Sequence, residues 1–174
     1  AAANGENALF ENFAVHLTDT DTGVADSTLS VRIVDDVPTA EADVDKTTSG
    51  TANGNVILGT GMTGGVADIA GADGLASPAV VGVSTSAGPI TDGTGAGGVV
   101  ASAKGTLTLG ADGAFTYPTT DAEATGTDTF YYTIIDKDGD PSTTTLTINL
   151  DSNPTITNLT PQGSGGDVSV DEDD

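Results

Sequence analysis

The sequence lacks the residues on which several classes of protein depend. It has no cysteine, so it forms no disulfide, and its single histidine leaves no ligand set for a zinc site. It has 4 lysines and arginines against 26 aspartates and glutamates, a formal charge of −22. Such a chain cannot neutralise phosphates or an anionic membrane surface, and it has no run of about 18 apolar residues. We therefore expect no nucleic-acid partner and no membrane insertion.

Residues that support catalysis are also scarce. There is no tryptophan and there are three tyrosines, which argues against the aromatic platforms of a sugar-cleaving site. His16 lies on the polar side of an alternating segment, where a surface imidazole is favoured over a catalytic base. No Gly-x-Ser-x-Gly or Walker loop is present. We therefore predict that the chain is not an enzyme.

What the sequence does have is the alternation of apolar and Thr-rich positions typical of half-buried antiparallel strands. No segment carries the apolar stripe of a helix. We therefore predict an all-β fold, an Ig- or cadherin-like antiparallel β-sandwich of about seven strands with parts of neighbouring repeats. The expected strands are near Ala40–Asp45, Asn55–Leu58, Ala79–Ser84, Thr106–Leu109, Phe115–Tyr117, Thr129–Ile135 and Thr144–Leu150.

An internal repeat divides the chain. Residues 13–38 match residues 130–154: each has an alternating strand, an Asp-x-Asp loop, a second alternating strand and an acidic linker ending in proline. The period is about 117 residues. We predict that residues 1–37 are the C-terminal hairpin and linker of a preceding repeat, 38–153 a complete β-sandwich repeat, and 154–174 a linker and the start of a following repeat. No signal peptide begins at Ala1, so we expect a piece of a longer protein.

The loop Asp136–Pro141 places three carboxylates, those of Asp136, Asp138 and Asp140, at alternate positions. Ca²⁺ takes about six to eight hard oxygen ligands, so such a loop suits it. A turn alone does not require three alternating acids. By contrast, the hairpin turn Ala111-Asp112-Gly113 accounts for its aspartate without a metal. The sequence therefore predicts calcium at the first loop and not at the second.

Strand order predicts which other acids join this loop. If successive strands reverse direction, the loops after alternate strands share the end where the chain enters the sandwich. Those loops and the entering linker add the candidate ligands Asp35, Asp36, Asp68 and Asp73. In the first repeat, Asp19 and Asp21 take the places of Asp136 and Asp138, and the exit linker offers Asp151 and Asn153. We predict that Ca²⁺ bridges linker and loop oxygens and makes the junction between repeats rigid.

The stretch GTLTLGADGAFTYPTTDAEATGTDTFYYTIIDKDGD carries four motifs in order: Gly-x-Leu-x-Leu, Asp-Gly-x-Phe-x-Tyr, Gly-x-Asp-x-Phe-x-Tyr and Asp-x-Asp-Gly-Asp. In this combination the chain resembles bacterial cadherin-like and VCBS-type repeats. More closely, it is similar to the tandem repeats of giant RTX adhesins exported by type I secretion. The resemblance covers about residues 13–154. In place of the Asn-Asp pair that often follows Val-Leu-Gly in that family, this chain has Gly59-Thr60-Gly61, so one expected ligand is missing.

The resemblance implies a calcium-stiffened sandwich in a long extracellular fibre on the bacterial surface, active in adhesion and biofilm formation. We therefore predict a structural spacer repeat, monomeric, whose partners are the adjacent repeats of the same polypeptide. The alternative is that the module itself binds a carbohydrate or protein ligand through Ca²⁺. An open coordination position beside exposed aromatic side chains would favour that alternative.

Overall fold

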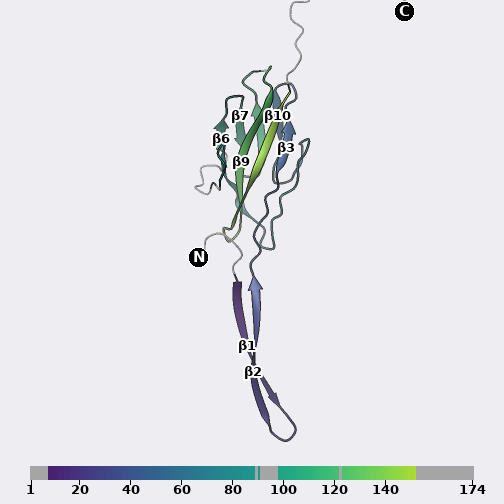
Figure 1. Cartoon of the computed structure of the whole chain (residues 1–174), viewed down its shortest axis with the longest axis vertical. Coiled ribbons are helices and arrows are strands. Elements are labelled where there is room, and N and C mark those ends of the chain that lie inside the picture. The colour runs from purple at the N-terminus through teal and green to yellow at the C-terminus, as the bar shows by residue number, and fades with distance from the viewer. Residues whose placement is uncertain (1–7, 89, 91–97, 122, 152–174) are drawn as a thin grey trace, which may run out of the picture.

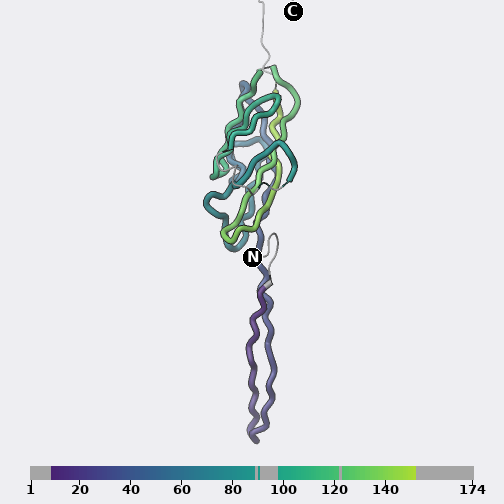
Figure 2. Tube along the Cα trace, turned by 90° about the vertical axis from the view of Figure 1, so that its left-hand side faces the viewer, coloured from purple at the N-terminus to yellow at the C-terminus, as the bar shows by residue number. Residues whose placement is uncertain are grey.

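The computed structural model describes residues 8–88, 90, 98–121 and 123–151. These ranges contain ten strands in three sheets and no helix, which confirms the predicted all-β class. Figure 1 shows a β-sandwich and a separate two-stranded hairpin that extends away from it along the long axis, and Figure 2 shows the same arrangement from the side. No helix in the described part of the chain is long and apolar enough to cross a membrane.

The sandwich consists of two four-stranded sheets. The first has the order β3 (Asp43–Lys46), β10 (Pro141–Leu150), β9 (Gly126–Asp136) and β5 (Leu75–Ser84). The second has the order β4 (Thr51–Asn55), β8 (Ala114–Pro118), β7 (Thr106–Leu109) and β6 (Gly98–Ala101). Neighbouring strands are antiparallel except β3, which runs parallel to β10 with Val44 opposite Thr147. The first and last strands of the sandwich therefore lie side by side.

The apolar core lies between the two sheets, because alternation directs every second side chain inward. In β9 the inward side chains are Phe130, Tyr132 and Ile134, all fully buried. The rings of Tyr117 and Phe130 meet edge to face across the sheets, with centroids 5.7 Å apart. The other core residues are Ala52, Val56, Val80, Val83, Leu107, Leu109, Phe115, Leu146, Ile148 and Leu150.

The third sheet is the hairpin of β1 (Ala8–Thr18) and β2 (Val24–Val34), in which Phe13 lies opposite Leu29. These two strands are predicted from alternation, and the structure confirms both. Every residue whose side chain is described in them is exposed, although the pattern is that of a half-buried strand. Among the described residues, β1 and β2 pair only with each other.

The structure differs from the predicted sandwich in two details. Of the predicted strand Asn55–Leu58, only Asn55 lies in a strand. Strand β4 ends there, the Oδ1 of Asn55 accepts the N–H of Leu58 at 2.9 Å, and Gly59 follows with a φ of 61°. These contacts form a turn in place of an extended segment. The described sandwich has eight strands because β6 pairs with β7. Strand β6 begins at Gly98, and residues 91–97 before it lie outside the described residues.

Candidate metal centre

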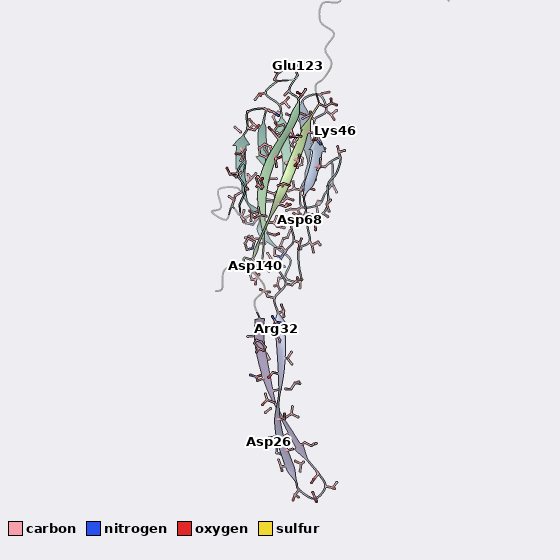
Figure 3. The ribbon with its side chains drawn as sticks, in the orientation of Figure 1. Asp26, Arg32, Lys46, Asp68, Glu123 and Asp140 are labelled. Atoms are coloured by element: carbon pink, nitrogen blue, oxygen red, sulfur yellow. The ribbon has the colours of Figure 1, made fainter. Side chains whose placement is uncertain are left out.

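Acidic loops meet at the end of the sandwich where the linker from β2 enters. Carboxylate oxygens of Asp35, Asp73 and Asp138 lie within 4.8 Å of one another, and so do those of Asp136, Asp138 and Asp140. Because Asp138 belongs to both sets, five carboxylates form one group, which we call the entry-pole carboxylates. Figure 3 shows Asp140 at the end of the sandwich that faces the hairpin, with Glu123 at the opposite end.

The turn between β9 and β10 positions three of these side chains. Asp136 Oδ1 accepts the backbone N–H groups of Gly139 and Asp140, at 3.0 and 2.8 Å. Gly139 has a φ of 102°, a conformation that glycine adopts without a steric penalty. Asp136 N–H also donates to the carbonyl oxygen of Asp140 at 3.2 Å. The turn is therefore closed by Oδ1 of Asp136, which leaves Oδ2 available.

Two oxygens of the group are buried without a partner. Asp136 is 1% exposed and Asp140 is 5% exposed. Oδ2 of each accepts no hydrogen bond from the described residues. No lysine or arginine in the described ranges pairs with any entry-pole carboxylate. Because an unpaired buried carboxylate oxygen is costly, this arrangement favours a bound cation.

The neighbouring groups raise the pKa of Asp138 to about 6, and the main cause is a side-chain hydrogen bond with Asp136. Desolvation and the negative charges of Asp136 and Asp35 raise this pKa further. The five carboxylates therefore repel one another in the absence of a counter-ion. All donors in the group are carboxylate oxygens, which suit a hard cation such as Ca²⁺. The residues present thus fit calcium, with Asp35, Asp73, Asp136, Asp138 and Asp140 as the side chains able to hold it.

Two other predicted ligands of this end have different roles. Asp36 Oδ2 accepts the backbone N–H of Ala72 at 2.9 Å, and so it ties the linker to the loop before β5. Asp68 does not join the group. Its Oδ1 accepts the N–H of Glu41 at 2.7 Å and lies 3.3 Å from the hydroxyl of Tyr132. Figure 3 shows Asp68 on the flank of the sandwich, farther from the hairpin than Asp140.

Asp68 instead forms a second acidic cluster with Asp43, which the sequence reading missed. Asp43 is fully buried, and its Oδ1 accepts the N–H of Val66 at 2.9 Å. Burial is the main cause that raises the pKa of both carboxyls, that of Asp68 to about 7. The sequence signal for this cluster is the two-residue period of β3, which places Asp43 and Asp45 on the inward face of that strand. Here each carboxylate accepts backbone or hydroxyl hydrogen bonds, so the cluster explains local structure without a ligand.

The sandwich and the linker that enters it match a known protein family. Residues 35–149 match the family of bacterial Ig domains. The chain belongs to this family. The match begins directly after β2 and ends in β10, so it contains the sandwich and all five entry-pole carboxylates. A comparison with curated proteins finds no match. Bacterial Ig domains are typically non-enzymatic structural domains of surface or extracellular proteins, in agreement with the predicted class.

Asp19, Asp21 and Asp151 lie away from the entry pole of the Ig domain. Asp19 and Asp21 lie in the exposed turn of the β1–β2 hairpin, where Asp19 Oδ1 accepts the N–H groups of Asp21 and Gly23 at 3.1 and 2.7 Å. A hydrogen bond with the Asp21 side chain is the main cause that lowers the pKa of Asp19. Gly23 occupies the position that corresponds to Asp140, so this turn lacks the third carboxylate of the Asp136–Asp140 loop. Asp151 is exposed near Thr47, and Asn153 lies outside the described residues.

Two further observations bear on the alternatives. Asp112 Oδ1 accepts the N–H of Ala114 at 3.2 Å, as predicted for a turn residue. A groove of about 430 Å³ between β3 and β4 is lined by Asp45, Lys46, Met62 and other small or polar residues. None of its lining residues is aromatic, and none is an entry-pole carboxylate. The groove is therefore separate from the entry-pole carboxylates.

Proposed function

We propose that this bacterial Ig domain is a calcium-stiffened structural repeat of a large bacterial surface adhesin. In that role it holds ligand-binding parts away from the cell and supports adhesion and biofilm formation. The supporting observation is the pair of buried Oδ2 atoms, from Asp136 and Asp140, that lack a hydrogen-bond partner among the described residues. As in the RTX adhesins that the chain resembles, export is by type I secretion.

The position of the site explains how calcium would stiffen the fibre. Asp35 belongs to the linker that leaves β2, whereas Asp73 and Asp138 belong to loops of the sandwich. Without a cation these like charges repel, and the linker carboxylate is driven away from the loops. A divalent ion held by all three would tie the linker to the sandwich. Adjacent repeats of one polypeptide are therefore the partners of this domain, which acts as a monomer.

Calcium binding is tested by isothermal titration of the full chain with CaCl₂, comparing Asp138→Asn with Asp112→Asn. Asp138 belongs to both sets of the group, so its substitution is expected to weaken binding at least about tenfold. Asp112 lies in a turn outside the group, so its variant serves as the matched control and is expected to bind as the unmodified chain does.

The same proteins are then melted in EDTA and in calcium. A ligand bound only by the native state, at about 100 times its Kd, stabilises that state by about 2.7 kcal/mol. We expect a higher Tm in calcium for the unmodified chain and the Asp112 variant, and a much smaller shift for Asp138→Asn. Melting curves that overlay with and without calcium would contradict the proposal.

A further inference from the structure

The β1–β2 hairpin exposes an apolar face. Phe13, Leu17 and Leu29 are 53%, 67% and 55% exposed. Figure 1 shows the hairpin pointing away from the sandwich, and no other described strand pairs with either of its edges. A lone two-stranded hairpin is marginally stable in water, and a contiguous exposed apolar face of this kind marks an interface.

The hairpin repeats the register of β9–β10. Phe13 lies opposite Leu29, and Phe130 lies opposite Leu146, so both members of the first pair become the second when 117 is added to their numbers. The same shift converts the pair His16 and Asp26 into Thr133 and Thr143, and the side chains of each pair are hydrogen-bonded. The two hairpins are therefore the same element at two places in the chain.

The turns of the two hairpins agree as well. Gly23 N–H donates to Asp19 Oδ1 at 2.7 Å, as Asp140 N–H donates to Asp136 Oδ1 at 2.8 Å. Thr22 has a φ of 75°, and Gly139, which is 117 positions later, has a φ of 102°. A non-glycine residue rarely adopts this conformation, so its appearance at the equivalent turn position supports the correspondence.

The correspondence also identifies which face is the inner one. The exposed residues Phe13, Val15, Leu17, Leu29, Val31 and Ile33 correspond to the buried core residues Phe130, Tyr132, Ile134, Leu146, Ile148 and Leu150. On the opposite face, Phe10 and Asn12 correspond to Thr127 and Thr129, which are exposed in the sandwich. The apolar face of the hairpin thus corresponds to the part of a sandwich core that β9 and β10 supply.

We propose that the β1–β2 hairpin is the last hairpin of a second Ig sandwich, and that the six other strands of that sandwich precede β1 in the polypeptide. The longest stretch outside the described residues, 152–174, is too short to supply them, because the six strands in this sandwich span residues 43–118. A second copy of this chain does not offer the site either, since its own β9–β10 already covers the corresponding face.

The structure defines the chemistry of that partner. The partner presents an apolar inner sheet. It places a parallel strand beside β2, as β3 lies beside β10, and an antiparallel strand beside β1, as β5 lies beside β9. Glu11 corresponds to Asp128, whose carboxylate accepts the hydroxyls of Ser102 and Tyr117. The partner therefore directs hydroxyl donors at Glu11. This inference rests on the tandem arrangement in the proposed function, but it does not depend on calcium.

A fusion protein tests the inference. A copy of residues 38–125 is joined directly to Leu9 of the chain, so that Leu9 takes the place of Gly126 and the rest of the chain is kept. Hydrogen exchange of the amides of residues 9–34 is measured in the fusion and in the chain alone, with β9–β10 as the internal reference for a folded sandwich. We expect exchange in the hairpin to slow at least about 100-fold in the fusion, because these amides join a closed sandwich.

Two variants of the fusion distinguish the faces. Phe13→Asp is expected to abolish the protection, and Asn12→Asp, on the outer face, is expected to retain it. Equally fast exchange in the fusion and the chain alone, or equal loss in both variants, would overturn the inference. A dimer of the chain alone with a protected hairpin would also overturn it, since the occupant would then be a second copy. Failure of calcium binding would leave the exchange result unaffected wherever the internal reference stays protected.

Discussion

At the scale of single residues, the carboxyl pair Asp43 and Asp68 on the flank of the sandwich has fewer hydrogen-bond donors around it than acceptor oxygens. The hydroxyl of Tyr132 lies 3.1 Å from Asp43 Oδ2, 3.1 Å from the carbonyl oxygen of Glu41 and 3.3 Å from Asp68 Oδ1. One O–H hydrogen cannot serve all three acceptors. A proton on Asp68, whose pKa burial raises to about 7, supplies what the cluster lacks.

This cluster predicts how stability depends on pH. The folded pKa of Asp68 lies above its ordinary value of 3.8, so the folded state binds more protons in this window, and its contribution to stability falls as pH rises from about 4 to about 7. We expect Asp68→Asn to flatten that fall, whereas Asp112→Asn keeps it. Urea unfolding at a series of pH values between 4 and 8 measures the slope. An unchanged slope in Asp68→Asn would show that other carboxyls set the dependence.

At the scale of elements, the close contact of β7 with β8 predicts a destabilising glycine substitution. A Cβ at Gly105 would lie 2.3 Å from the ring of Tyr117, which is fully buried and bonded to Asp128. Since that ring cannot move away, we expect Gly105→Ala to cost about 1–3 kcal/mol of stability. Gly64→Ala is the control, because its Cβ would meet Val44 at an ordinary 3.5 Å. Chemical denaturation of the two variants compares them, and equal midpoints would disprove the steric argument.

The elements also show what sequence could predict. Strands β9 and β10 are predicted from the alternation in Phe130–Ile134 and Leu146–Leu150, and their hairpin loop brings Asp136, Asp138 and Asp140 together. Asp68 was predicted at the entry end because the whole connection between the second and third expected strands was assigned to that end. The connection 56–74 instead runs back along β3, with bridges Val44–Gly64 and Thr39–Ile69. Such a return depends on long-range backbone pairing, which local alternation does not encode.

At the scale of the whole molecule, a charge of −22 and the position of the acids act together. Acidic residues outnumber basic ones along the chain, but five carboxylates are concentrated where the linker from β2 meets the sandwich. Repulsion there acts between the hairpin linker and the sandwich, which only a few residues join. It therefore alters the orientation of the hairpin relative to the sandwich more than it alters folding. The domain family match begins at Asp35, the linker residue of this group, which places the site at a domain boundary.

This arrangement predicts that calcium narrows the range of angles between the hairpin and the sandwich. Because the chain has no cysteine, spin labels at Thr28→Cys and Thr116→Cys, both exposed, report one distance between β2 and β8. We expect a broad distance distribution in EDTA and a narrow one in calcium. The distance distribution of Asp138→Asn is expected to stay broad in both EDTA and calcium, whereas that of Asp112→Asn is expected to match the unmodified chain. A width that calcium leaves unchanged in the unmodified chain would mean that the linker is set by backbone contacts such as that of Asp36 with Ala72, and not by a bound ion.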